Sequence, residues 1–195
     1  NKLSLNIIEN DIDKSFEVLK SYNPRINPLE VDVTPKVIFS EATSHWQGEF
    51  ILSDVINKFY ESMNLTAYIY PETLDFLDKL KAEGYKIAAL TDVAIGMPDE
   101  LHKSYFPELL PYFDMYVSSI SCGYRKPNPK GLSDIAENFG VVPSEMIMIG
   151  DEEKDIKTAK RFGCKSVLIY RRDKNANFGQ DYTVTDLNKL WEMMK

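Results

Sequence analysis

The chain has 195 residues, of which 44% are hydrophobic and 12% aromatic, enough for one domain with a sizeable core and a small appendage. Acidic residues outnumber basic ones by 30 to 23, and the formal net charge is −7 without any basic block. This balance argues against nucleic-acid binding, which depends on clustered Lys and Arg. No apolar run approaches the roughly 18–20 residues that cross a bilayer, which argues against a membrane protein.

The cysteine content and the start of the sequence indicate in which cellular compartment the protein is found. Cys122 and Cys164 form neither a metal-like pair nor a disulfide framework, and no signal peptide opens the sequence. Unpaired cysteines suit a reducing environment. We therefore expect a cytoplasmic protein.

Residues 1–65 predict a small helical cap. Apolar residues recur there at intervals of three or four, the spacing of one helical face: Leu5, Ile8, Ile12, Phe16 and Leu19. Asn-Pro pairs at 23–24 and 27–28 interrupt this pattern, and a second amphipathic run covers residues 50–63.

Residues 66–195 alternate between helical patterns and short apolar runs. Helices are predicted from Pro71 to Gly84, before Gly140, before Gly163 and at the carboxyl terminus. The apolar runs predict strands at 86–91 (KIAALT), 115–118 (MYVS), 146–149 (MIMI) and 167–170 (VLIY), the first and third buried on both faces. Such alternation is typical of an open parallel, Rossmann-like α/β sheet flanked by helices, which binds ligands at the carboxyl ends of its strands.

Two carboxylates follow the third predicted strand. Asp151 and Asp155 are four residues apart across a strand-to-helix turn, so both can point to one place. Hard oxygen ligands of this kind suit Mg²⁺, which completes its shell with waters and phosphate oxygens. The alternative is a helix N-cap and a solvated acid in the first helical turn, where acids are common.

Lys126 and Thr91 follow two other predicted strands. Pro127 and Pro129 stiffen the loop around Lys126, and a rigidly placed ammonium suits a phosphate or a developing negative charge. Thr91 ends its strand and offers a hydroxyl beside backbone amides. Each residue alone also fits an ordinary exposed loop lysine or a strand-end threonine.

Together the segments KIAALTD, GYRKPNP and MIGDEEKD resemble the second, third and fourth motifs of the haloacid dehalogenase superfamily, whose members are mostly Mg²⁺-dependent phosphatases. The resemblance covers residues 66–195, and the first 65 residues resemble the small helical cap of the commonest subgroup. The G-x-R-K-P-x-P pattern together with G-D-x-x-x-D is specific enough to argue against chance agreement.

The resemblance implies roles for five residues. Thr91 would hydrogen-bond the phosphoryl group, and Lys126 would neutralise the nucleophile and the phosphoryl charge. Asp151 would coordinate Mg²⁺, and Asp155 would support the metal or orient Lys126. Asp92 stands where the family more often has Asn, and it adds a carboxylate at the substrate-binding edge without a defined role.

The first family motif, which carries the nucleophilic aspartate on a buried strand, has no good match. The nearest spacing begins at Asp11, but the helical pattern runs through it and favours a solvated helix face. The resembled fold places the missing strand between those ending at Thr91 and Gly150, whose backbone groups would otherwise lack partners. Because the sequence opens at Asn1 directly with the cap-like helix, we expect the nucleophile to lie outside it.

The favoured function is therefore hydrolysis of a small phosphorylated metabolite through an aspartyl-phosphate, with Mg²⁺ as cofactor. Two alternatives stay within the family: 2-haloacid dehalogenation, which needs no metal, and phosphosugar mutation. A third is a non-catalytic regulatory relative. His45 and His102 lack ligand-like neighbours in the sequence and are expected to be structural or exposed.

Overall fold

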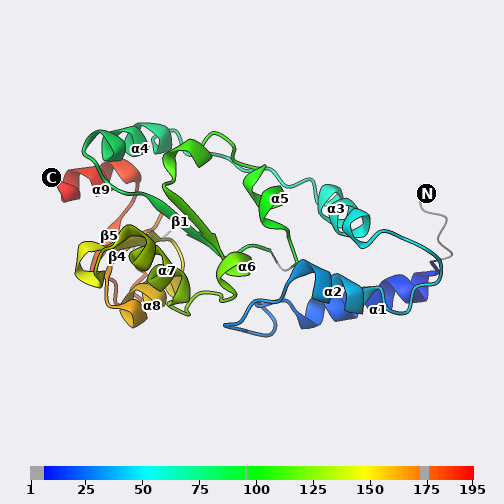
Figure 1. Cartoon of the computed structure of the whole chain (residues 1–195). Helices are drawn as coiled ribbons and strands as arrows, with labels where there is room; N and C mark the ends of the chain where they lie inside the picture. The colour runs from blue at the N-terminus through cyan, green and yellow to red at the C-terminus, as the bar shows by residue number, and fades with distance from the viewer. Residues whose placement is uncertain (1–6, 95, 172–175) are drawn as a thin grey trace.

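The computed structural model describes residues 7–94, 96–171 and 176–195. A layer of helices occupies one end of the molecule, and parallel strands flanked by helices occupy the other (Figure 1). The α/β fold class predicted from the sequence is confirmed. Among the described residues, every helix is too short or too polar to span a membrane.

Three helices form the layer at the amino-terminal end: α1 (Glu9–Ser21), α2 (Pro35–Ala42) and α3 (Leu52–Ser62). The α2 helix packs between the other two. Their common core contains Phe39, Tyr60 and Met97, the last from the segment after the first strand. The predicted helix at this end is thus present, although Leu5 of its pattern lies outside the described residues.

The strands form two parallel sheets. One sheet pairs β1 (Ala88–Thr91) with β2 (Met115–Ser118), and the other has the order β3-β4-β5. The second sheet contains β3 (Ile147–Gly150), β4 (Lys165–Ile169) and β5 (Tyr182–Val184). All four predicted strands are found, within two residues at each end, and β5 is an addition.

The predicted helices of the α/β part are also present. They are α4 (Thr73–Ala82), α7 (Lys130–Phe139), α8 (Glu153–Phe162) and α9 (Leu187–Met194). Gly140 and Gly163 end two of them in the left-handed conformation that glycine adopts without steric cost. Four short helical turns were not predicted: α5 (Asp99–Lys103), α6 (Ser119–Cys122), η1 (Leu110–Tyr112) and η2 (Pro143–Glu145).

Two apolar cores hold the helices against the sheets. The α4 and α9 helices bury Phe76, Leu77 and Leu190 against β4 and β5. The α7 and α8 helices enclose the other core with β2 and β3. Gly131 lets α7 approach β1, because a Cβ atom at Gly131 would lie 2.4 Å from Cδ1 of Leu90.

The two sheets are not joined through β1 and β3. No described residue forms a hydrogen-bonded ladder between these strands. Ile147 and Ile149 are 45% and 37% exposed, so the prediction that the MIMI strand is buried on both faces was wrong at these positions. The physical reason is that β3 is an edge strand, with β4 on one side and no described strand on the other.

The helical layer is tied to the α/β part by a short backbone ladder. Val31 forms an antiparallel bridge with Tyr124, and the Asp32 amide donates to the Gly123 carbonyl at 2.9 Å. The helical layer and its core therefore include contacts beyond residue 65, and the predicted domain boundary there stays a prediction.

Candidate functional site

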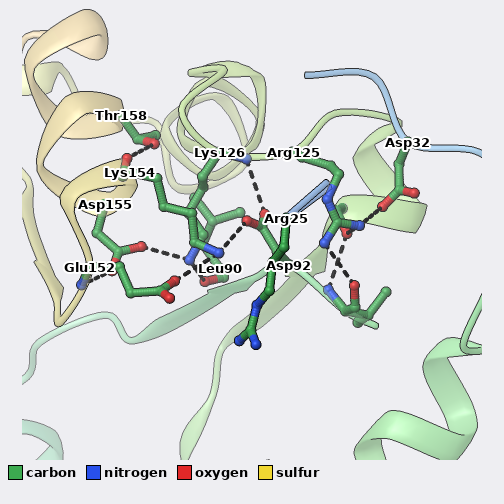
Figure 2. A network of polar contacts seen from close by, with 12 residues as sticks. Arg25, Asp32, Leu90, Asp92, Arg125, Lys126, Glu152, Lys154, Asp155 and Thr158 are labelled. Atoms are coloured by element: carbon green, nitrogen blue, oxygen red, sulfur yellow. Dashed lines mark hydrogen bonds and ion pairs between the residues drawn. The ribbon is translucent and has the colours of Figure 1, made fainter. Parts of the chain in front are cut away.

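Lys126 lies at the centre of a polar network at the carboxyl ends of the strands (Figure 2). Its Nζ lies 2.7 Å from Oδ1 of Asp155 and 3.5 Å from the carbonyl oxygen of Leu90. The side chains of Lys126 and Asp155 are only 12% and 5% exposed. The sequence placed these residues in separate motifs, and the fold brings them into direct contact.

Asp155 uses both of its carboxylate oxygens. Oδ2 accepts hydrogen bonds from the backbone amides of Asp151 at 3.1 Å and Glu152 at 2.9 Å, at the start of α8. Gly150 makes room for this arrangement, since a Cβ atom there would lie 2.3 Å from the Asp155 Cβ. Of the two roles that the family resemblance implied for Asp155, these contacts favour orienting Lys126. Direct metal coordination by Asp155 stays a prediction.

Asp92 holds the lysine loop from the other side. Its Oδ1 accepts a hydrogen bond from the backbone amide of Lys126 at 3.0 Å, and its Oδ2 lies 3.1 Å from Nζ of Lys154. Burial disfavours the charged form of Lys154, but the hydrogen bond to Glu152 and the charge of Asp92 raise its pKa above the usual value. The carboxylate whose role the sequence left open is thus neutralised by a neighbouring lysine that sequence reasoning missed.

Two predicted site residues are available to a ligand. Thr91 ends β1 opposite Ser118, and its hydroxyl makes no hydrogen bond within the described part of the chain. The exposed carboxylate of Asp151 likewise has no ion pair or hydrogen bond with a described residue. The strand ends therefore carry, besides the buried lysine, a hydroxyl at the end of β1 and a carboxylate directly after β3.

The carboxylates at the strand ends can be compared with the ligands that Mg²⁺ requires. Within the described ranges, no three His, Cys, Asp or Glu side chains converge on one point. Mg²⁺ does not require such a cluster, because it is commonly bound by one or two carboxylates together with waters and phosphate oxygens. The unpartnered oxygens of Asp151 suit this mode, so the residues present fit the metal.

A cavity of about 960 Å³ lies between the helical layer and the strand ends. Lys126 and Asp92 line it from the α/β part, and α1, α3 and the loop at 23–30 line it from the helical layer. Thr91, Asp151 and Asp155 are each adjacent in sequence to a lining residue but are not among those lining the cavity in the described chain. The volume matches a small-molecule site.

A second buried ion pair connects the helical layer to this network. Nη1 of Arg125 lies 2.7 Å from Oδ2 of Asp32, with the two side chains 8% and 4% exposed. Nη2 of Arg125 donates to the Val93 carbonyl at 2.9 Å, in the loop after β1. Sequence reasoning identified neither partner, because 93 positions separate them.

Asp11, the alternative nucleophile, lies in the first turn of α1 and does not line the cavity. Its backbone carbonyl contacts Nε2 of His45 at 2.8 Å. His102 contacts the Tyr116 hydroxyl at 2.7 Å, so both histidines have structural contacts, as expected. Burial lowers the pKa of His102.

Comparisons with known proteins agree with this architecture. A family model described as haloacid dehalogenase-like hydrolase matches residues 3–163. The chain is 28% identical over 144 residues to phosphoglycolate phosphatase from Escherichia coli strain K12, and 26% identical over 144 residues to that from Salmonella choleraesuis. Each match covers 73% of this chain and 55% of the relative, so the chain spans about half the length of these curated relatives.

Solved structures share the fold. A phosphatase of the same superfamily from Thermococcus onnurineus aligns with a TM-score of 0.61 at 24% identity, over 82% of this chain and 69% of that one. A 2-haloacid dehalogenase from Pseudomonas syringae aligns with a TM-score of 0.67 at 15% identity, over 97% and 82% of the two chains. At these identities the alignments establish the fold.

Proposed function

Because the chain belongs to the haloacid dehalogenase-like hydrolases, we propose that the protein hydrolyses a small phosphomonoester with the help of Mg²⁺. The observation that carries the proposal is the contact of Lys126 with Asp155 at the strand ends, where Lys126 lines a small-molecule cavity. The Thr91 hydroxyl and the Asp151 carboxylate, which have no partner among the described residues, lie at the ends of β1 and β3. A cation, a hydroxyl and a metal-binding carboxylate are the groups that phosphoryl transfer needs.

In the proposed reaction, Lys126 binds the phosphoryl group. An ammonium has three N–H donors, and Asp155 takes one of them at 2.7 Å while the Leu90 carbonyl lies at the limit of hydrogen bonding. A donor therefore remains for a phosphoryl oxygen, and the Thr91 hydroxyl supplies another. Asp92 contributes by fixing the Lys126 backbone, and catalysis by these residues consists of positioning and charge neutralisation.

Asp151 is the residue that would hold Mg²⁺. When bound, the metal would neutralise charge on the phosphoryl oxygens. Asp155 would act mainly through Lys126, since its carboxylate oxygens already accept hydrogen bonds from that ammonium and two amides.

The nucleophile in this proposal is an aspartate outside residues 1–195, on a parallel strand between β1 and β3. The separate sheets of β1 and β3 support this placement. Its carboxylate oxygen would bond to phosphorus as the P–O bond to the alkoxide breaks, and the alkoxide would take a proton from water to leave as the alcohol. Water would then cleave the acyl phosphate to release inorganic phosphate and restore the carboxylate.

Phosphoglycolate is the first substrate to test, because the curated relatives named above are phosphoglycolate phosphatases. The cavity volume also favours a small metabolite over a bulky partner. A cytoplasmic location is part of the proposal, supported by the free thiols of Cys122 and Cys164.

The test is Mg²⁺-dependent phosphate release from phosphoglycolate by the protein as its source produces it. Asp151→Asn should lower the rate by at least about a hundredfold. Glu153→Gln is the matched control, because this exposed carboxylate lies two residues further along, at the start of α8. Among the described residues it pairs with Lys157 at 2.9 Å, and the substitution should leave the rate within twofold.

Other outcomes would overturn the proposal. Halide release from a 2-haloacid that resists EDTA would identify a dehalogenase instead. Isomerised phosphosugar without free phosphate would identify a mutase. Absence of turnover with each substrate class would favour a non-catalytic relative.

A further inference from the structure

The cavity is much larger than a phosphoryl group, and its other walls carry charges of their own. Its cationic lining residues are Lys20, Arg25, Arg125, Lys126 and Lys154. Its acidic lining residues are Glu30, Asp92 and Glu152. A lining charge that has no oppositely charged side chain nearby can bind a charged group of a ligand.

Nearly all of them are paired. The buried Arg125 and Lys126 pair with Asp32 and Asp155, at 2.7 Å in each case. The other pairs are Lys20 with Glu17, Lys154 with Asp92 and Glu152, and Arg161 with Glu30. Within the described ranges of the chain, Arg25 is the lining cation whose guanidinium has no carboxylate within ion-pair distance.

The backbone fixes where Arg25 enters the cavity. Its amide donates to Oδ1 of Asn23 at 2.9 Å, and the amides of Ile26 and Asn27 donate to the Asn23 carbonyl at 2.9 and 2.8 Å. Pro24 lies within this turn and Pro28 directly follows it, and both restrict the backbone further. In Figure 2 the Arg25 side chain extends past Asp92, and no dashed line reaches its guanidinium.

We propose that Arg25 binds a second anionic group of the substrate, a carboxylate or a second phosphate, and so selects phosphomonoesters that carry one. This inference rests on the proposed function, because it places the phosphoryl group at Lys126. A guanidinium presents two parallel N–H donors that match a carboxylate or phosphate, and an unpaired one in a ligand cavity attracts such a group. Since the loop of Arg25 belongs to the helical layer, the two ends of the ligand would contact different parts of the molecule.

The test compares ligands that share a phosphonate and differ at the far end. Calorimetric titration of the full-length protein with Mg²⁺ present would use phosphonopropionate, which has a carboxylate, and propylphosphonate, which does not. The wild-type protein should bind phosphonopropionate about tenfold more tightly. Arg25→Gln should remove this preference while leaving the affinity for propylphosphonate within twofold.

A control and a third ligand sharpen the result. Lys36→Gln removes one positive charge at an exposed position of α2, outside the cavity, and should keep the preference. Propane bisphosphonate distinguishes the two anions: tighter binding than phosphonopropionate, again lost in Arg25→Gln, would identify a second phosphate as the group selected.

The failures are distinguishable. Equal binding of all ligands to the wild-type protein, or an unchanged preference in Arg25→Gln, would overturn the role of Arg25 and leave the phosphoryl site intact. Failure of all ligands to bind would overturn the phosphoryl site, and this inference with it.

Discussion

Nζ of Lys126 lies 2.7 Å from Oδ1 of Asp155, and this ion pair connects the carboxyl ends of two separate sheets. Lys126 follows β2 of the first sheet, and Asp155 follows β3 of the second. The described strands form no backbone ladder between the sheets, so this buried pair is a direct polar link across the junction (Figure 2).

The close packing of Gly150 against Asp155 predicts the effect of adding one methyl group. Gly150→Ala would place its Cβ 2.3 Å from the Asp155 Cβ, an atom too close to the backbone to move freely. We expect the free energy of unfolding to fall by about 2–3 kcal/mol in urea titrations. Gly84→Ala is the control: its Cβ would meet nothing within 4 Å, so only the left-handed backbone at φ 79° opposes it, at about 1 kcal/mol. Equal losses in the two variants would contradict the packing argument.

The buried pair of Arg125 and Asp32 predicts a strong energetic coupling between the helical layer and the α/β part. Asp32→Leu and Arg125→Met should each lower the free energy of unfolding by about 3 kcal/mol or more, because each strands a buried charge. The double variant should lose no more than either single variant, since it leaves neither charge unpaired.

Denaturant titration of the four proteins measures this coupling. The exposed pair of Glu153 and Lys157 is a suitable comparison, and its coupling should stay below about 1 kcal/mol. Strictly additive losses at Arg125 and Asp32 would show that the pair does not couple the two parts.

The hydrogen bonds that Asp181 accepts predict that it stabilises the folded protein in a pH-dependent way. Hydrogen bonds from the backbone and hydroxyl of Ser166, with the ammonium of Lys165, lower the pKa of Asp181 to about 2. A depressed pKa in the folded state stabilises the protein above the ordinary pKa of 3.8, and this stabilisation is lost as the pH falls through about 2.

Asp181→Asn should therefore destabilise the protein at pH 7 by about 1 kcal/mol, a value reduced for solvent screening because the side chain is 35% exposed. The difference from wild type should narrow between about pH 4 and 2, as measured by urea unfolding across this range. Glu49→Gln, at an exposed carboxylate without an ion pair in the described chain, serves as control. A difference that is constant with pH would refute the assignment.

The sequence predicted those features that depend on local pattern. Four strands were recognisable as short apolar runs, and helices ended where Gly140 and Gly163 allow a left-handed cap. The motifs around Lys126 and Asp155 were recognisable because the fold needs fixed residue types just beyond strand ends. Their mutual contact followed from the resemblance to a known family rather than from spacing.

Features that depend on distant contacts were not predictable. Lys154 looks like any exposed helical lysine until the fold sets it beside Asp92. Arg125 pairs with Asp32 from 93 positions away, and no local pattern marks either residue. The exposure of Ile147 and Ile149 is equally a property of sheet neighbours, which an apolar run cannot reveal.

The neighbouring residues Arg125 and Lys126 have a practical consequence for engineering. The Arg125 side chain anchors the segment around Asp32, and the Lys126 side chain belongs to the proposed phosphoryl-binding network, so two consecutive loop positions have different roles. A chimera that replaces the helical layer with that of a relative would have to transplant residues 30–32 and 123–125 as one matched unit. Exchanging residues 1–65 alone would replace the segment that contains Asp32, the partner of Arg125. A changed Arg125 contact would in turn disturb the neighbouring Lys126.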